Sequence, residues 1–300
     1  MKNVLMELSN DLANAVEHGG RAVVAVPEGG RSGVSGTVWR EGVVVTAEHT
    51  IRGRDTVMLV GPSGDTLSAS VVGRDPSTDI AVLRLAGGSP AVTGFADPAQ
   101  LKVGNVVLAL GRRETGLRAS YGIVGFLGGA WRTWQGGRID QSLRLDLNPY
   151  PGFSGGPLVD AGGRVLGINT SGPSRTAMTI PNPTVDRVVD QLLSKGRIVR
   201  GYIGIGGQPA EIPSTLREKL ALKQNHGLLV ITIANSGPAE RAGITVGDII
   251  LAIDSSSIAE PGDLLAVLDP DTVGKTLRVR VLRGGTPTEL AVTIGERGGE

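Results

Sequence analysis

The chain has 300 residues, 40% of them apolar and 20% charged, so it is long enough for two domains that each bury a core. A formal charge of +1 without a run of like charges excludes a basic surface for nucleic acid or an anionic membrane, and a peptide or protein partner is expected instead. With no cysteine and only three histidines, the chain offers no disulfide, thiolate metal site or readable metal cluster, and no cofactor is predicted.

The composition favours short strands. The 46 glycines and 17 prolines suit strands joined by tight turns better than long helices.

No stretch is long and apolar enough to span a bilayer. Glu7, Asp11 and Glu17 interrupt the apolar core that a signal peptide needs near the N-terminus. The compartment stays open: cytoplasmic for the chain as written, periplasmic or secreted if the chain is a processed form.

Residues 1–20 are predicted to form an N-terminal helix that docks on the next domain, because apolar residues recur at helical spacing before Gly19 and Gly20. Short β-rich runs separated by turn signals follow, which predicts an antiparallel barrel or sandwich. A second helix has Asn182 as its expected cap and ends at Lys195-Gly196, where we place the domain boundary. The expected strands cover residues 22–26, 36–39, 43–46, 57–60, 80–85, 106–110, 158–159 and 165–168.

The distal part of the chain, residues 196–300, is predicted to be a small α+β domain. Strand and helix patterns alternate in it, and about 100 residues suffice for an independent domain. The expected elements cover residues 202–205, 214–222, 228–233, 238–242, 249–253, 261–268, 277–282 and 289–294.

The first candidate for chemistry is a serine between glycines, in the run Gly152-Phe153-Ser154-Gly155-Gly156. Glycines let the backbone present a hydroxyl outward and turn its own N–H groups toward an oxyanion. A plain turn is the competing interpretation. The nucleophile elbow of other hydrolases is excluded, because the glycines before Pro157 cannot start a helix and the only downstream histidine, His226, lies in the other predicted domain.

A histidine at the end of an apolar strand is the second candidate. His49 follows the expected strand 43–46 closely, and a strand end followed by a loop gives a general base both rigidity and access. The other two histidines are interpreted without a catalytic role, His18 as part of a helix end and His226 as a loop residue.

Asp79 is the candidate third member. It enters the apolar run 80–85, where a carboxylate is costly to bury without a partner such as a histidine N–H. Asp75 is the competitor, but it precedes a proline and fits a turn. The order His49, Asp79, Ser154 in a β-rich domain is the order of chymotrypsin-type serine proteases.

Further sequence runs surround the three candidate residues. They are Thr46-Ala47-Glu48-His49, Gly73-Arg74-Asp75 with Asp79-Ile80-Ala81-Val82-Leu83, Leu101-Lys102-Val103-Gly104 with Ala109-Leu110-Gly111, and residues 152–159 with Gly167-Ile168-Asn169. With these runs the proximal domain resembles the HtrA/Deg family of trypsin-like serine proteases. The resemblance implies an all-β protease domain, a chymotrypsin-like double β-barrel, at residues 21–195. It also implies an endopeptidase of unfolded or misfolded proteins, with His49, Asp79 and Ser154 as the triad and the amides of Gly152 and Ser154 as the oxyanion hole.

The distal domain contains three further runs: Arg200-Gly201-Tyr202-Ile203-Gly204-Ile205, Gly237-Pro238-Ala239 with Ala242-Gly243, and Gly247-Asp248-Ile249-Ile250. With these runs it resembles the PDZ domain that follows such proteases. The resemblance implies that Tyr202, Ile203, Gly204 and Ile205 form a loop whose backbone amides receive the carboxylate of a peptide laid against a sheet edge. C-terminal peptides are therefore the partners expected there.

Two residues depart from the family pattern near the expected triad. Phe153 stands where the family has asparagine before the serine, and Glu48 replaces a small or amide residue before the histidine. A homotrimer is one option from the resemblance, although the aromatic residues that cement it in relatives are absent before Trp39. Two other functions stay open: a catalytically silent peptide-binding or chaperone-like protein that uses the same cleft and PDZ domain, and a scaffold in which only the distal half works.

Overall fold

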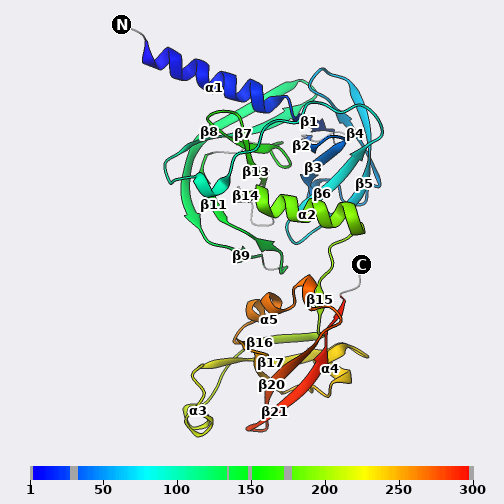
Figure 1. Cartoon of the computed structure of the whole chain (residues 1–300), viewed down its shortest axis with the longest axis vertical. Helices are drawn as coiled ribbons and strands as arrows, with labels where there is room; N and C mark the ends of the chain where they lie inside the picture. Colours follow the sequence, from blue (N-terminus) through cyan, green and yellow to red (C-terminus); the bar gives the residue numbers. More distant parts are fainter. Residues whose placement is uncertain (1–2, 28–32, 134, 148–150, 172–177, 297–300) are drawn as a thin grey trace. The chain divides into compact units, whose positions relative to one another are not determined.

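The computed structural model describes residues 3–27, 33–133, 135–147, 151–171 and 178–296. The chain divides into two compact units, Met1–Ile198 and Val199–Glu300 (Figure 1). Strands dominate the first unit, and the second combines a sheet with short helices. Within these described ranges, no helix has the length and apolar character that crossing a membrane requires.

The first half of unit 1 is a closed antiparallel barrel with the strand order β1-β2-β3-β6-β5-β4. Its β3 strand is buried along its whole length, because Val44 packs inside the barrel while Val43 and Val45 pack in a core shared with the second half. In the sequence, a strand buried on both faces is a continuous apolar run and does not alternate between apolar and polar residues. The strands are β1 (Val23–Val26), β2 (Val34–Arg40), β3 (Val43–Ala47), β4 (Thr56–Val60), β5 (Thr66–Asp75) and β6 (Ile80–Leu85).

The second half of unit 1 is a six-stranded antiparallel sheet with the order β11-β8-β7-β12-β13-β14. Its outer strands β11 and β14 contact each other, so the sheet curls toward a barrel. The 3₁₀ turns η1 (Glu48–Thr50) and η2 (Pro98–Gln100) precede it in the chain. The strands are β7 (Val106–Arg113), β8 (Gly116–Gly128), β11 (Ser142–Asp146), β12 (Pro157–Asp160), β13 (Val165–Thr170) and β14 (Met178–Pro181), beside the pair β9 (Trp131–Arg132) and β10 (Arg138–Ile139).

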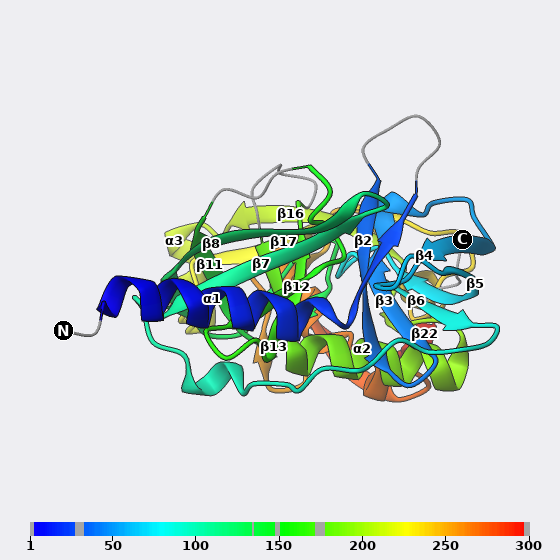
Figure 2. The same cartoon turned by 90° about the horizontal axis from the view of Figure 1, so that it is seen from above.

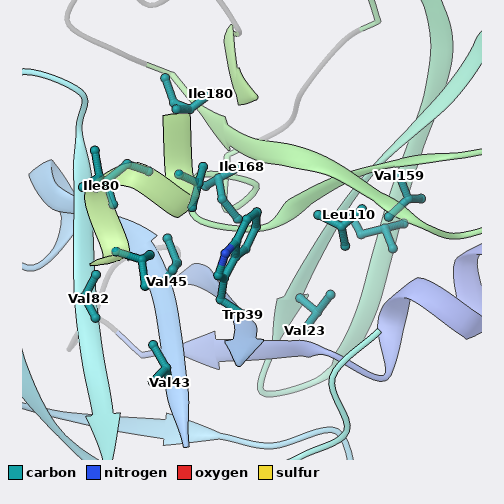
Figure 3. Close-up of a cluster of buried hydrophobic side chains, with 14 of the residues drawn as sticks. Val23, Trp39, Val43, Val45, Ile80, Val82, Leu110, Val159, Ile168 and Ile180 are labelled. Carbon is teal, nitrogen blue, oxygen red and sulfur yellow. The ribbon is translucent and has the colours of Figure 1, made fainter. Parts of the chain in front are cut away.

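One apolar core joins the two halves. Trp39 of β2 is 1% exposed and packs among side chains from β3, β6, β7, β13 and β14 (Figure 3). Its indole Nε1 donates to Asp186 of helix α2 (Asn182–Lys195) over 2.7 Å, which satisfies the polar atom of a buried aromatic ring. The barrel and the sheet are thereby held as one unit.

The two helices of unit 1 differ from the sequence predictions in part. Asn182 does not cap α2: its side-chain amide donates to the carbonyls of Ala96 and Val165, and the cap position is Pro181. The helix ends at Lys195, before Gly196 with φ +69°, as its sequence indicates.

Helix α1 (Val4–Gly20) docks through only part of its apolar face. Figure 2 shows α1 lying beside β7 and β12. Leu12, Ala15 and Val16 pack on the core, while Leu5 and Leu8 are 77% and 52% exposed. The prediction of a helix is right, but its first two turns extend beyond the surface of the sheet.

Unit 2 is built on a six-stranded antiparallel sheet, in which five strands follow the order β16-β17-β18-β20-β21 and the short β19 pairs with β18. Its core includes Ile203, Leu228, Val279 and Leu264, the last from helix α5 (Pro261–Val267). A second pairing joins β15 (Gly201–Tyr202) to β22 (Gly295–Glu296). The other elements are β16 (Ile205–Glu211), α3 (Ser214–Leu220), β17 (His226–Ile233), α4 (Pro238–Arg241), β18 (Ile249–Ile253), β19 (Ser256–Ser257), η3 (Pro270–Thr272), β20 (Thr276–Arg283) and β21 (Thr286–Thr293).

Candidate active site

His49 and Asp79 lie at the same end of two paired strands. Ala47, the last residue of β3, is the partner of Ile80, the first residue of β6, so the residues just beyond them are neighbours. A hydrogen bond of 3.0 Å from the Glu48 amide to the Asp79 carbonyl closes this end. His49 is the middle residue of η1, directly after the strand. The buried strands therefore set the position of the imidazole.

The Asp79 carboxylate is bound by three donors. It accepts from the backbone amide of His49 at 2.9 Å, from His49 Nδ1 at 2.8 Å, and from the hydroxyl of Thr170 at the end of β13. Asp79 has φ +58°, a left-handed conformation that aspartate adopts more readily than most residues. With Nδ1 directed at the carboxylate, the lone pair for a further proton is on Nε2.

The competing aspartate is occupied elsewhere. Asp75 is 2% exposed, and its carboxylate accepts from the Ser77 hydroxyl at 2.6 Å and the Thr78 hydroxyl at 2.7 Å. These contacts stabilise the turn between β5 and β6, which is the role that a residue before proline suggests.

The hydrogen bond to Asp79 raises the pKa of His49 above the ordinary value of 6.5, against the lowering effect of burial. The negative charges of Asp79 and Glu48 raise this pKa further, and the positive charge of Arg52 lowers it. Glu48 has a side chain only 5% exposed, and it pairs with Arg52 Nε over 3.1 Å. In the sequence, Glu48 departs from the family pattern before the histidine. In the structure, its buried carboxylate lies beside the imidazole of His49.

Ser154 lies in a tight loop that leads into β12. Gly155 has φ +82°, and a side chain there would meet the Ser35 carbonyl at 2.0 Å, so only glycine fits. The amide of Gly155 donates to the Asn169 carbonyl at 2.8 Å, and the amide of Ser35 donates to the Ser154 carbonyl at 3.0 Å. The loop is therefore attached both to β13 and to β2 of the barrel.

The peptide bond before Gly152 is also held. The Pro151 carbonyl accepts from Arg113 at 3.2 Å and from Arg118 at 3.4 Å, and the Gly152 carbonyl accepts from the buried Ser35 hydroxyl at 2.7 Å. Because a trans peptide directs its N–H opposite its C=O, the two arginines fix the direction of the Gly152 amide. Gly152 itself has φ +105°. Neither Ser35 nor the arginines stand out in the sequence.

Phe153 anchors this loop. Its side chain is 2% exposed and packs with Val107, Val124 and Leu158 inside the second sheet. Arg118 stacks over the ring, 6.0 Å from its centroid. The family departure at this position therefore replaces a polar side chain with a buried aromatic one that holds the loop to the sheet.

Residues at the end of β13 connect the two parts of the site. Thr170 donates to the Asp79 carboxylate, and the next residue, Ser171, lies against Ser154 with both its amide and its hydroxyl 3.3 Å from the Ser154 hydroxyl oxygen. Among the described residues, His49 makes no hydrogen bond to Ser154. Thr170 and Ser171 were not predicted as site residues, although they directly follow the run Gly167-Ile168-Asn169.

The predicted carboxylate loop in unit 2 has outward-facing amides. The Ile203 carbonyl accepts from the Ala239 amide and the Gly204 carbonyl from the Ala234 amide, both at 2.8 Å. The amides that share those peptide planes, those of Gly204 and Ile205, therefore point away from these two contacts. In this described segment, no acceptor takes the N–H of Ile203 or Gly204. Gly204 has φ +82°, which the sharp turn of the loop requires.

Comparison with known proteins gives a consistent result for both units. Residues 34–168 match the trypsin-like peptidase domain, and residues 201–294 match the PDZ domain. A probable periplasmic serine endoprotease, DegP-like, from Brucella suis is 34% identical over 265 residues, covering 85% of this chain and 50% of the relative. A serine protease Do-like HtrA from Lactobacillus helveticus is 31% identical over 85% of this chain and 65% of the relative. The chain thus spans about half the length of the first of these relatives.

Solved structures agree with these matches. The HtrA-type protease AlgW with a decapeptide superposes with a TM-score of 0.78 at 26% identity, covering 96% of this chain and 99% of that one. The serine endoprotease from Yersinia pestis gives a TM-score of 0.76 at 29% identity, with 96% and 98% coverage. Over most of its length the chain is therefore similar to HtrA-type serine proteases, with a match to a trypsin-like peptidase domain followed by a match to a PDZ domain.

Proposed function

We propose that the chain is a serine endopeptidase that hydrolyses peptide bonds of unfolded or misfolded proteins through His49, Asp79 and Ser154. The observation that carries this proposal is the Asp79 carboxylate on His49 Nδ1, with Thr170 and Ser171 linking that pair to the Ser154 hydroxyl. The relatives, one named a probable serine endoprotease and one named a serine protease, support the same reaction. Since one of them is named periplasmic, the periplasm is the compartment we propose.

In this reaction the Ser154 hydroxyl attacks the scissile carbonyl while His49 Nε2 takes its proton and then delivers it to the leaving amine. Asp79 keeps the imidazole in the required tautomer and stabilises its positive charge. The amides of Gly152 and Ser154 donate to the oxyanion. Before attack, the Ser154 hydroxyl must turn from Ser171 to the imidazole, and catalytic hydrogen bonds often form only with substrate present.

The PDZ unit provides a second binding site in this proposal. The free amides of Ile203, Gly204 and Ile205 receive a peptide carboxylate, and the chain preceding that carboxylate pairs with the edge of β16. Ile203 and Ile205 belong to the same apolar core as Leu264 of α5, so an apolar C-terminal side chain is the expected ligand.

The peptidase proposal is tested by Ser154→Ala. Because triad members act as a unit, this variant is expected to lose roughly a million-fold in kcat on unfolded casein. A fluorophosphonate probe should label the parent chain at Ser154 and leave the variant unlabelled. Ser68→Ala is the matched control, since it removes an exposed hydroxyl on β5 and should keep both labelling and cleavage. A parent chain that binds casein without labelling or cleavage would instead establish a silent peptide binder.

A further inference from the structure

The edge strand of the PDZ unit carries a proline in its middle. β16 is an edge strand of the six-stranded sheet, and the described residues include no strand paired with its other side. Its sequence is Ile205-Gly206-Gly207-Gln208-Pro209-Ala210-Glu211, and Pro209 is exposed. Proline has no backbone N–H, so its orientation decides which hydrogen-bond ladder is interrupted.

Hydrogen bonds beyond both ends of β16 show which residues face β17. The Gly204 carbonyl accepts from the Ala234 amide at 2.8 Å, just before the strand, and the Ile212 amide donates to the Asn225 carbonyl at 2.9 Å, just after it. Backbone groups alternate between the two sides of a strand with a period of two. The even-numbered residues of β16 therefore bond to β17.

The alternation is not reset within the strand. The register shift of this pair falls between Gly206 and Gly207, and it leaves Ile231 of β17 without a partner, so the extra residue is in β17 and β16 stays regular. The odd-numbered residues, Ile205, Gly207, Pro209 and Glu211, thus direct their backbone groups to the free edge. Pro209 interrupts that edge and leaves the pairing with β17 intact.

The position of the carboxylate loop sets the register of a bound peptide. With its carboxylate on the amides that end at Ile205, an antiparallel peptide places its last residue opposite Ile205 and its third residue from the end opposite Gly207. The fifth residue from the end then lies opposite Pro209. Gly207 can both donate to and accept from its partner, whereas Pro209 can only accept.

We propose that Pro209 ends the full hydrogen-bond ladder of the PDZ unit, so that the backbone of the last three residues of a ligand is recognised fully and the fifth carbonyl finds no donor. This inference rests on the carboxylate binding proposed above. Its ligands are peptides with a free C-terminus and an apolar last residue. The geometry makes Pro209 a determinant of how long a segment the site recognises.

The test measures binding of acetylated peptides of three and six residues that share the same C-terminal sequence. The full chain carries Ser154→Ala throughout, so that no peptide is consumed, and calorimetry gives the Kd. Pro209→Ala restores one edge donor, and one net hydrogen bond predicts about 3- to 10-fold tighter binding of the six-residue peptide. The three-residue peptide does not reach this position, and its Kd should stay unchanged.

Gln208→Ala is the matched control. The backbone of residue 208 bonds to β17, and both glutamine and alanine keep the backbone N–H, so this variant should alter the Kd of neither peptide. A second measurement needs no change in the protein. Replacing the amide after the fifth residue from the end by an ester weakens that carbonyl as an acceptor, which should not affect binding to the parent chain. The same ester after the third residue from the end, opposite Gly207, should weaken binding.

The outcomes separate the two proposals. Any one of three results would overturn the role of Pro209. Pro209→Ala could change the Kd of both peptides equally, or it could change neither Kd. The third result is that the ester after the fifth residue from the end weakens binding to the parent chain. Such a result would leave protection of the edge against pairing with other strands as the function of the proline. An amidated peptide that binds as tightly as the free acid would overturn the carboxylate site itself.

Discussion

The His49–Asp79 pair and the Ser154 loop are held in different ways. His49 and Asp79 follow and precede paired strands of one barrel, and the Glu48 amide bonds directly to the Asp79 carbonyl. The Ser154 loop depends on distant contacts, with Ser35 in the barrel and Phe153 in the second sheet. One half of the site is a local consequence of strand pairing, and the other exists only when both halves of the unit are assembled.

This difference predicts two kinds of variant. Changes at the pair should alter the chemistry of the imidazole with little effect on the loop. Changes around Ser154 should alter the position of the proposed nucleophile and oxyanion amides without touching a titratable group. The three predictions below test this distinction, beginning with the largest effect.

Asp79→Asn should lower kcat by roughly 10⁴-fold, because an amide opposite Nδ1 favours the wrong imidazole tautomer. Steady-state cleavage of a peptide substrate measures the loss. Asp75→Asn is the matched control, since Asp75 bonds to Ser77 and Thr78 in a turn and not to His49. If Asp75→Asn lost as much kcat as Asp79→Asn while both stayed folded, the assignment of the two aspartates would be wrong.

Ser35→Ala should weaken the connection between the barrel and the Ser154 loop. Its hydroxyl donates to the Gly152 carbonyl and accepts from the Arg112 amide, so the variant leaves two backbone groups without this partner. The cost is about 1–3 kcal/mol, or about 5- to 150-fold in kcat if it falls entirely on the loop.

The rate of fluorophosphonate labelling and thermal unfolding together measure this effect. Ser68→Ala, an exposed serine of β5 in the same barrel, is the control and should change stability by less than about 0.5 kcal/mol. Labelling at the parent rate in Ser35→Ala would show that the loop holds its conformation without the barrel.

Glu48→Gln should have the smallest effect, a displacement of the pH profile. Cleavage requires neutral His49, so kcat/KM rises as the pH passes through the pKa of this histidine, which lies above 6.5. Removing the Glu48 charge lowers that pKa and moves the rise to lower pH. Arg52→Gln removes a charge of the opposite sign and should move it to higher pH. If both variants moved the rise in kcat/KM to the same side of the parent profile, this electrostatic account would be contradicted.

Much of the first unit could be predicted from its sequence. The apolar runs of β3 and β6, the apolar face of α2 and the glycines around Ser154 carry local signals that the structure retains. Strand β5 escaped prediction because most of its residues are half-buried or exposed and it contains no long apolar run. Asn182 carries a capping signal, but its side-chain amide donates to two carbonyls from other segments and therefore does not cap the helix.

The sequence by itself determined the order of the site residues, the two-domain organisation expected of the family and the glycines that the Ser154 loop and the carboxylate loop require. These features depend on residue type and on neighbours a few positions away. Only the tertiary structure revealed that Thr170 and Ser171 contact the proposed triad residues, that Ser35 and two arginines hold the loop before Ser154, and that Pro209 faces the free edge of β16. A hydrogen bond between residues 117 positions apart leaves no local pattern, and the side to which a strand residue turns depends on the pairing of its neighbours.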